Sequence, residues 1–271
     1  SLFLADSCKE ETKKDISINT TDNGGFDVES SLIKENPNKN CYFGDLHLHT
    51  ALSVDANMFG ASLGPEDSYK YALGQEVEYL GQKVKRIAPL DFLAVTDHAE
   101  YLGVMVDVRR EGSDISKTDL GKLLSSTKPE DQDKAFAVLS GAVATNTRIP
   151  DLENQEVYKD NWERVIDAAE KYNKPGEFTS LVGFEWTSAP GTANKAQQNL
   201  HRCVIFKGDN VPELPYSSFD SQDPEDLWTY LENARKTGDD VIAIPHNGNI
   251  SNGLMFDTKT LSGEPLTKEY A

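Results

Sequence analysis

The chain alternates short apolar runs with segments whose apolar residues recur at helical spacing. Five runs rich in Val, Ile, Leu or Phe predict strands at residues 41–46, 90–96, 180–186, 202–206 and 241–244. Amphipathic segments that begin at Pro65, Gln155 and Asp223 predict helices between them. Such alternation predicts an α/β fold with a parallel sheet and helices outside, either a barrel or an open sheet.

Two stretches depart from this alternation. Residues 1–40 hold few apolar positions among Lys, Glu, Asn, Asp and Thr, which is typical of an N-terminal tether that precedes a folded domain at 41–271. Residues 104–160 contain charged, helix-like pieces at 119–125 and 129–139, which predict a helical insertion on the C-terminal side of the sheet. An insertion there commonly shapes access to substrate, although a solvated decoration without function is the alternative.

Charge excludes some classes of partner. The 271 residues carry 27 Lys plus Arg and 45 Asp plus Glu, a formal net charge of −18. Phosphate backbones and anionic membrane surfaces repel such a chain, so we expect no nucleic-acid partner. No apolar run is long enough to cross a bilayer, so we expect no transmembrane segment.

The three cysteines, Cys8, Cys41 and Cys203, are too few and too scattered for a disulfide framework. Cys41 and Cys203 lie in apolar runs and are expected to be buried and inert. Cys8 follows Leu2-Phe3-Leu4-Ala5-Asp6-Ser7, which is similar to the end of a secretory signal before a bacterial lipoprotein cysteine. This N-terminal stretch predicts that the protein is located in the periplasm or cell envelope. The alternative is that the stretch is a processing artefact and that the protein is cytoplasmic.

The five histidines gather where predicted strands end. His47 and His49 follow the first strand, His98 follows the second, and His246 follows the last. Residues two apart in a strand point to one side, so His47 and His49 can bind one metal ion together. In α/β folds the C-terminal ends of parallel strands form the active-site face, which would place these side chains around one cavity.

Glu185 and His201 join this set by the same reasoning. Glu185 ends a strand too apolar to hold a carboxylate without a partner such as a cation. His201 precedes its apolar run, but an antiparallel return of 199–206 along 181–186 would bring it close to Glu185. Imidazoles and carboxylates suit Zn²⁺, Mn²⁺ or Fe²⁺, and several of them together can hold two or three divalent ions.

The ordered motifs resemble those of the polymerase and histidinol phosphatase (PHP) superfamily, most closely a bacterial branch known only as a domain of unknown function. The residues that carry the resemblance are Asp45-Leu46-His47-Leu48-His49-Thr50 with Ser53 and Asp55, Thr96-Asp97-His98, Glu185, His201, and Pro245-His246-Asn247 with Asn249 and Ser251. The resemblance spans about 41–256. It implies a distorted (β/α)₇ TIM-like barrel, a cluster of two or three metal ions and hydrolysis of phosphate esters.

Carried over by position, the resemblance makes His47 and His49 ligands of a first ion, which Glu185 bridges to another. His98 would bind the second ion, and His201 and His246 would bind a third with Glu185. Asp55 stands where many members have His, so it is either a substitute ligand or a group behind the ligands. The family's last Asp-x-His motif has no counterpart after His246. We therefore expect the barrel to be incomplete at the C-terminus, with its final strand beyond residue 271 or on another chain.

The expected activity is metal-dependent hydrolysis of a small phosphate ester by a metal-bound hydroxide. Asp45 and Asp97 adjoin the ligands and are the candidate catalytic acids, which would orient imidazoles or relay protons. Asn247 and Asn249 could contact substrate or merely shape a turn, and Arg202 is a candidate anion contact. Hydrolysis of C–N or C–O bonds, as in amidohydrolases or lactonases, is one alternative, and a non-catalytic metal-binding module of a larger protein is another.

Overall fold

The computed structural model describes residues 39–190, 198–268 and 270. By its internal contacts the chain divides into Ser1–Asn40 and Cys41–Ala271. The predicted tether corresponds to the first unit. Apart from Lys39 and Asn40, this tether, with the lipoprotein-like Cys8, lies outside the described residues. All that follows concerns the second unit.

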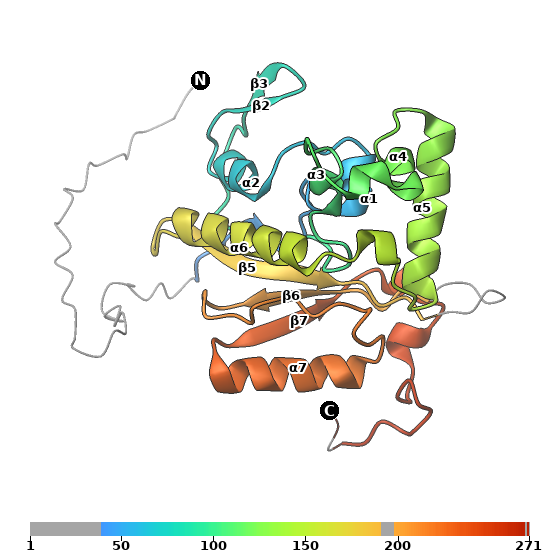
Figure 1. The fold of residues 1–271 in the computed structure, drawn as a ribbon. Helices are drawn as coiled ribbons and strands as arrows, with labels where there is room; N and C mark the ends of the chain where they lie inside the picture. Colours follow the sequence, from blue (N-terminus) through green and yellow to red (C-terminus); the bar gives the residue numbers. More distant parts are fainter. Residues whose placement is uncertain (1–38, 191–197, 269, 271) are drawn as a thin grey trace, which may run out of the picture. The chain divides into compact units, whose positions relative to one another are not determined.

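A curved five-stranded sheet forms the centre of this unit (Figure 1). Its strands, in spatial order, are β1 (Gly44–Asp45), β4 (Phe92–Val95), β5 (Thr179–Trp186), β6 (Arg202–Phe206) and β7 (Val241–Pro245). The pairs β1–β4 and β4–β5 are parallel, whereas β6 runs antiparallel to both β5 and β7. The five predicted strands are thus present, and the predicted antiparallel return of the fourth is confirmed.

The predicted (β/α)₇ TIM-like barrel is wrong. Within the described residues the sheet is a five-stranded half-barrel with β1 and β7 at its edges, and one strand is antiparallel. The segment between β4 and β5 supplies helices and adds no strand to it. Apolar periodicity marks individual strands, but closure depends on pairing between distant segments, which periodicity does not encode.

Helices precede and follow these strands. They are α1 (Val54–Met58), α2 (Pro65–Ala72), α3 (Val104–Asp107), α4 (Asp119–Leu124), α5 (Pro129–Ala144), α6 (Gln155–Tyr172) and α7 (Pro224–Thr237). Short 3₁₀ turns are η2 (Ile115–Lys117), η3 (Pro150–Leu152), η4 (Gly248–Ile250) and η5 (Leu254–Phe256), and β2 (Val77–Tyr79) pairs with β3 (Gln82–Val84) in a hairpin. The side chains of Asn154 and Asp223 cap α6 and α7 by accepting hydrogen bonds from their first backbone N–H groups.

The main core lies between the sheet and helices α2, α6 and α7. Trp162 of α6, Phe184 of β5 and Leu227 of α7 are almost fully buried there, in one continuous apolar cluster. Burying each such side chain stabilises the fold by about 1.5–3 kcal/mol. The other face of the sheet carries a smaller cluster built on Ala94, Cys203 and Ile205. This inner face leads to the histidines.

Residues 104–160 contain α3, α4, α5 and the start of α6 and pack around a second apolar cluster that includes Leu124, Leu139 and Leu152. After β7 the described chain forms η4 and η5 and a bridge between Lys259 and Pro265. Gly263 has a left-handed φ of 94°, and the described residues after it form no helix. No helix among the described residues is long and apolar enough to span a bilayer.

Candidate metal centre

The register of the sheet brings the predicted ligands to one place. Glu185 is paired with Cys203 of β6 on one side and forms a bridge with His98 on the other. His201 comes two residues before Cys203, and the backbone N–H of His246 donates to the carbonyl of His201 at 3.2 Å. Because alternate residues of a strand share a face, these side chains all lie on the inner face of the sheet.

All five histidines place a ring nitrogen near the carboxylate of Glu185, which is 1% exposed. Oε2 lies 3.1 Å from His47 Nε2, 2.6 Å from His49 Nε2 and 3.7 Å from His98 Nδ1; Oε1 lies 2.6 Å from His201 Nδ1 and 3.0 Å from His246 Nε2. The carboxylate is therefore the centre of the cluster, and its two oxygens face different histidines.

Asp55 adds a second carboxylate at the edge of the cluster. It lies in the first turn of α1, and its two oxygens are 3.4 Å from His49 Nδ1 and 3.3 Å from His98 Nε2. His49 therefore stands between two carboxylates, with one ring nitrogen toward each. This position supports Asp55 as a candidate metal ligand within the cluster.

The charges of the cluster depend on one another. Burial alone would raise the pKa of Glu185, but His98 and hydrogen bonds to His201, His246 and His47 hold it well below its usual value. Burial alone would lower the pKa of His49, but hydrogen bonds to Asp55 and Glu185 raise it to about 10. By contrast, burial lowers the pKa of His201, and its hydrogen bond to Glu185 only partly opposes this shift. Without metal, the raised pKa of His49 thus favours a protonated imidazole between the carboxylates of Asp55 and Glu185.

The donor set suits divalent metal ions. Nitrogen and oxygen ligands about 2.0–2.1 Å from a zinc ion lie about 3.4 Å apart in tetrahedral geometry. The groups His49, Asp55, His98 and Glu185, His201, His246 each offer three donor atoms that lie within 4.8 Å of one another. Their separations of 2.6–3.4 Å need only small adjustments around an ion. A buried Glu185 among several histidines could therefore bind a metal ion.

Asp97 supports the loop that carries two of these ligands. Its carboxylate is 1% exposed and accepts hydrogen bonds from the backbone N–H and hydroxyl of Thr50 and from the hydroxyl of Ser53. Ser53 Oγ also accepts from the backbone N–H of His98. Burial raises the pKa of Asp97, and the hydrogen bonds from Thr50 and Ser53 oppose that shift. The structure thus turns Asp97 toward the loop. Asp45 is exposed and accepts from the backbone N–H of His47.

The three predicted substrate contacts lie at different places. Asn247 and Asn249 are exposed in the turn after β7, next to His246, and Asn247 has a left-handed φ of 57°. Arg202 is on the opposite face of β6 from His201, with its guanidinium 5.5 Å from the ring centroid of Trp186 and 5.1 Å from that of Trp228. The structure does not bring Arg202 into the histidine cluster.

Two groups near the cluster were not predicted from the sequence. Thr187 Oγ1 lies 2.5 Å from His98 Nδ1, so the Nε2 of that ring is left to face Asp55. Thr187 comes two residues after Glu185, and strand alternation could have placed it on the same face. Glu100 accepts a hydrogen bond from the backbone N–H of Thr187 at 3.4 Å and one from the backbone N–H of Ser218.

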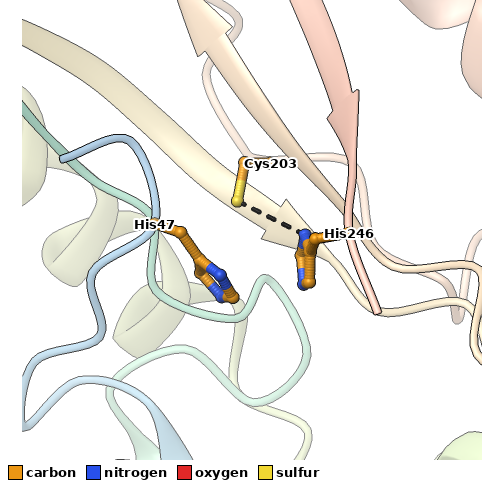
Figure 2. Close-up of side chains that lie close together, drawn as sticks. All are labelled: His47, Cys203 and His246. Carbon is orange, nitrogen blue, oxygen red and sulfur yellow. Dashed lines mark hydrogen bonds between the residues drawn. The ribbon is translucent and has the colours of Figure 1, made fainter. Parts of the chain in front are cut away.

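Cys203 is the third unpredicted neighbour; it is buried as expected, whereas Cys41 is exposed, so the expectation of burial was wrong for Cys41. Figure 2 shows the sulfur of Cys203 pointing into the space between the rings of His47 and His246, with a dashed line to a nitrogen of His246. The sulfur lies 3.7 Å from His246 Nδ1, and His47, Cys203 and His246 form a further group of three donor atoms within 4.8 Å of one another. Because Cys203 comes two residues after His201, strand alternation could have placed both side chains on the same face. The apolar run around Cys203 instead indicated an inert core residue.

Comparison with known proteins supplies a family and no activity. No curated protein and no solved structure matches the chain. The profile of the family described as "Protein of unknown function (DUF3604)" matches residues 36–271, which is most of the chain and the whole of the cluster. The chain therefore belongs to this family of proteins of unknown function.

Proposed function

We propose that this protein is a metal-dependent hydrolase whose substrates are phosphate esters. The observation that carries the proposal is the convergence of five imidazoles on the buried carboxylate of Glu185, at 2.6–3.7 Å. Burying a carboxylate is costly unless cations or hydrogen bonds compensate it, and neutral imidazoles are common metal ligands. A site of this kind is more readily explained by bound ions than by the stability of the fold.

The arrangement favours more than one ion. The triads His49, Asp55, His98 and Glu185, His201, His246 have no member in common, so each could hold an ion without competing for a ligand. His47, whose Nε2 is 3.1 Å from Glu185 Oε2, lies beside both triads and could complete either. We therefore propose two ions, with space for a third, and Zn²⁺, Mn²⁺ or Fe²⁺ as the candidates.

Bound divalent ions supply two things to such a reaction: they polarise a phosphoryl oxygen, and they lower the pKa of a coordinated water from 15.7 to about 7. The side chains of this protein hold and orient the reacting groups. Glu185 joins the two triads, and Thr187 fixes the ring of His98 through Nδ1. Asp97 holds the Thr50–Ser53 loop in place from behind.

A water nucleophile agrees with the side chains at the site. The thiol of Cys203 is 3% exposed, and burial raises its pKa to about 12, so it is a poor nucleophile at neutral pH. The hydroxyl of Thr187 is engaged with His98. The PHP-like motifs favour phosphate esters among the bonds that such a site could hydrolyse.

The test is a set of chromogenic substrates given to the purified protein with saturating Mn²⁺ or Zn²⁺. It contains a phosphomonoester, a phosphodiester, a carboxylic ester, a lactone and an amide. We expect turnover of a phosphate ester that a chelator abolishes and added metal restores. Turnover of the lactone or amide alone would replace the proposed substrate class, and bound metal with no turnover would indicate a non-catalytic module.

The matched control is a buried carboxylate outside the cluster. Asp107 is 7% exposed and is paired with Arg110 and Ser113 in and after α3. Asp107→Asn should keep its activity, whereas His201→Ala and His98→Ala should each lose most of theirs. Full activity in both histidine variants would place the hydrolytic site elsewhere.

A further inference from the structure

The thiol of Cys203 stands within the cluster and has no role in the proposed hydrolysis. It is one of the small group of buried side chains on the inner face of the sheet, with Ala94 and Ile205. The sulfur is within hydrogen-bonding distance of His246 Nδ1 and Thr96 Oγ1, each 3.7 Å away. A side chain that merely filled the core would have no need of a histidine nitrogen beside it.

The geometry of the three donors suits a metal ion. With a zinc–sulfur distance of about 2.3 Å and a zinc–nitrogen distance of about 2.0–2.1 Å, a tetrahedral site separates sulfur from nitrogen by about 3.6 Å. Cys203 Sγ and His246 Nδ1 are 3.7 Å apart. The rings of His47 and His246 lie with their centroids 4.0 Å apart, and a nitrogen of His47 is within 4.8 Å of both other donors.

His246 presents its two nitrogens to two different groups. Its Nε2 lies 3.0 Å from Glu185 Oε1, while its Nδ1 faces Cys203 (Figure 2). The ring therefore stands at the boundary between an oxygen-rich donor set and a set that contains sulfur. Thiolates favour Zn²⁺ and other thiophilic ions, whereas carboxylates suit Mn²⁺ and Mg²⁺.

We propose that Cys203, His246 and His47 form a separate position for a thiophilic divalent ion, Zn²⁺ or a similar soft ion, beside the Glu185 site. The inference rests on the proposed function, because His246 and His47 belong to both donor sets. Binding would replace the proton of the thiol by the ion and release that proton to solvent. When His246 also holds an ion of the Glu185 site through Nε2, its ring would coordinate as an imidazolate and release its N–H proton as well. The protein would then discriminate among divalent ions by the donor atoms of each position. Soft ions would bind at Cys203, and harder ions would bind at the carboxylates.

The test uses the full chain with Cys203 as its one remaining thiol. The sequence has three cysteines, so the double variant Cys8→Ser/Cys41→Ser leaves Cys203 alone and unaltered. Metal-free protein is titrated with Co²⁺ and with Cd²⁺, and thiolate-to-metal charge-transfer absorption is recorded. Bound metal is measured in parallel by equilibrium dialysis. We expect the charge-transfer band in this variant and its loss when Cys203→Ser is added.

The affinities provide a second measurement. Cys203→Ser should weaken Cd²⁺ binding by about tenfold or more and change Mn²⁺ binding less than about twofold. Unfolding of the metal-free variants, followed by circular dichroism, shows whether the substitution has damaged the fold. If it has, the band in the variant that retains Cys203 still decides the question.

The outcomes separate this inference from the proposed function. Metal bound without a charge-transfer band, or a band that survives Cys203→Ser, would overturn the sulfur site and leave the Glu185 site in place. No bound metal in any variant would overturn both proposals.

Discussion

The two oxygens of Glu185 face two differently built sides of one cluster. On the carboxylate side, defined by His49, Asp55 and His98, the donors are imidazoles and an oxygen. On the thiol side, His201 and His246 face Oε1, and the sulfur of Cys203 lies beside His246 where the carboxylate side has a second carboxylate. Hard and soft donors therefore occupy opposite sides of one bridging group.

The two sides also differ in what holds them in place. The carboxylate side depends on the Thr50–Ser53 loop and α1, which hydrogen bonds to the buried Asp97 secure. The thiol side depends on β6 and β7, which pair over five residues and contribute Ile205 and Ile244 to the apolar cluster on the inner face. We infer that a polar network sets the geometry on one side and sheet pairing sets it on the other, so different substitutions should damage each.

Removal of the bridging charge should have the largest effect, because it acts on both sides. Glu185→Gln keeps the shape of the side chain but removes the negative charge that five imidazoles face. We expect metal affinity and hydrolysis to fall more than about 100-fold, beyond the effect of losing a group behind a ligand. Metal stoichiometry from equilibrium dialysis and activity toward the best phosphate ester measure this. Loss of one ion with full retention of the other would mean that Glu185 does not join the two sides.

The sequence predicted most of this cluster for reasons that the structure makes plain. Three strand ends finish in His, and Glu185 stands in a run too apolar for an unpartnered carboxylate. His201 required the assumption of an antiparallel strand, which is present. Alternation along β6 also places Arg202 on the outer face, one residue from His201, between two tryptophans.

The remaining features depend on distant pairings or on side chains with ordinary alternative roles. Cys203 lies in an apolar run, where burial alone accounts for a cysteine, and only its pairing with Glu185 reveals its neighbours. The hydroxyl of Thr187 could not be assigned to His98 before β4 and β5 were known to be adjacent. The prediction of a closed barrel was wrong because apolar periodicity identifies individual strands but does not show whether the two edge strands pair with each other.

Damage to the polar network should affect the carboxylate side first. Asp97→Asn replaces one acceptor oxygen of the carboxylate by an NH₂ group, so at least one of the three donors that now bond to Asp97 loses its acceptor. We expect the free energy of unfolding to fall by about 2–4 kcal/mol, since each lost hydrogen bond to a charged group is worth about 1.5–3 kcal/mol. Urea unfolding measures this, and the fully exposed Asp119→Asn is the control.

The same variant also bears on the division between the sides. Asp97→Asn should weaken Mn²⁺ binding on the carboxylate side while the charge-transfer band of Cys203 persists. Equal loss at both sides would show that the Thr50–Ser53 loop supports the whole cluster rather than one half of it.

Acidity should separate the two sides without any substitution. In the metal-free protein the pKa of His49 rises from 6.5 to about 10, so an ion on the carboxylate side must displace a proton. The pKa of His201 is lowered by burial, so an ion beside it need not displace one at neutral pH. Mn²⁺ affinity should rise about tenfold per pH unit for each displaced proton between roughly pH 6.5 and 9. Calorimetry in buffers of different ionisation enthalpy counts those protons.

The stability of the metal-free protein should change in the opposite direction. A raised imidazole pKa stabilises the folded state fully below the ordinary value of 6.5, and that contribution is lost as the pH rises through about 10. Asp55→Asn removes one partner of His49 and should flatten both dependences. Metal affinity that is independent of pH in the wild-type protein would contradict this account.

The smallest expected effect concerns the orientation of the His98 ring, which Thr187 contacts. Thr187→Val keeps the shape of the side chain and removes the hydroxyl 2.5 Å from His98 Nδ1. Because groups behind metal ligands contribute about 10–100-fold to affinity, we expect Mn²⁺ binding to weaken about tenfold, with about 1 kcal/mol lost from the free energy of unfolding. Thr187→Ser should restore the affinity, and Thr229→Val, on α7, should leave it unchanged. If Thr187→Val lowers stability but not affinity, then Asp55 and Glu185 alone orient His98, and the carboxylate side does not need the hydroxyl of Thr187.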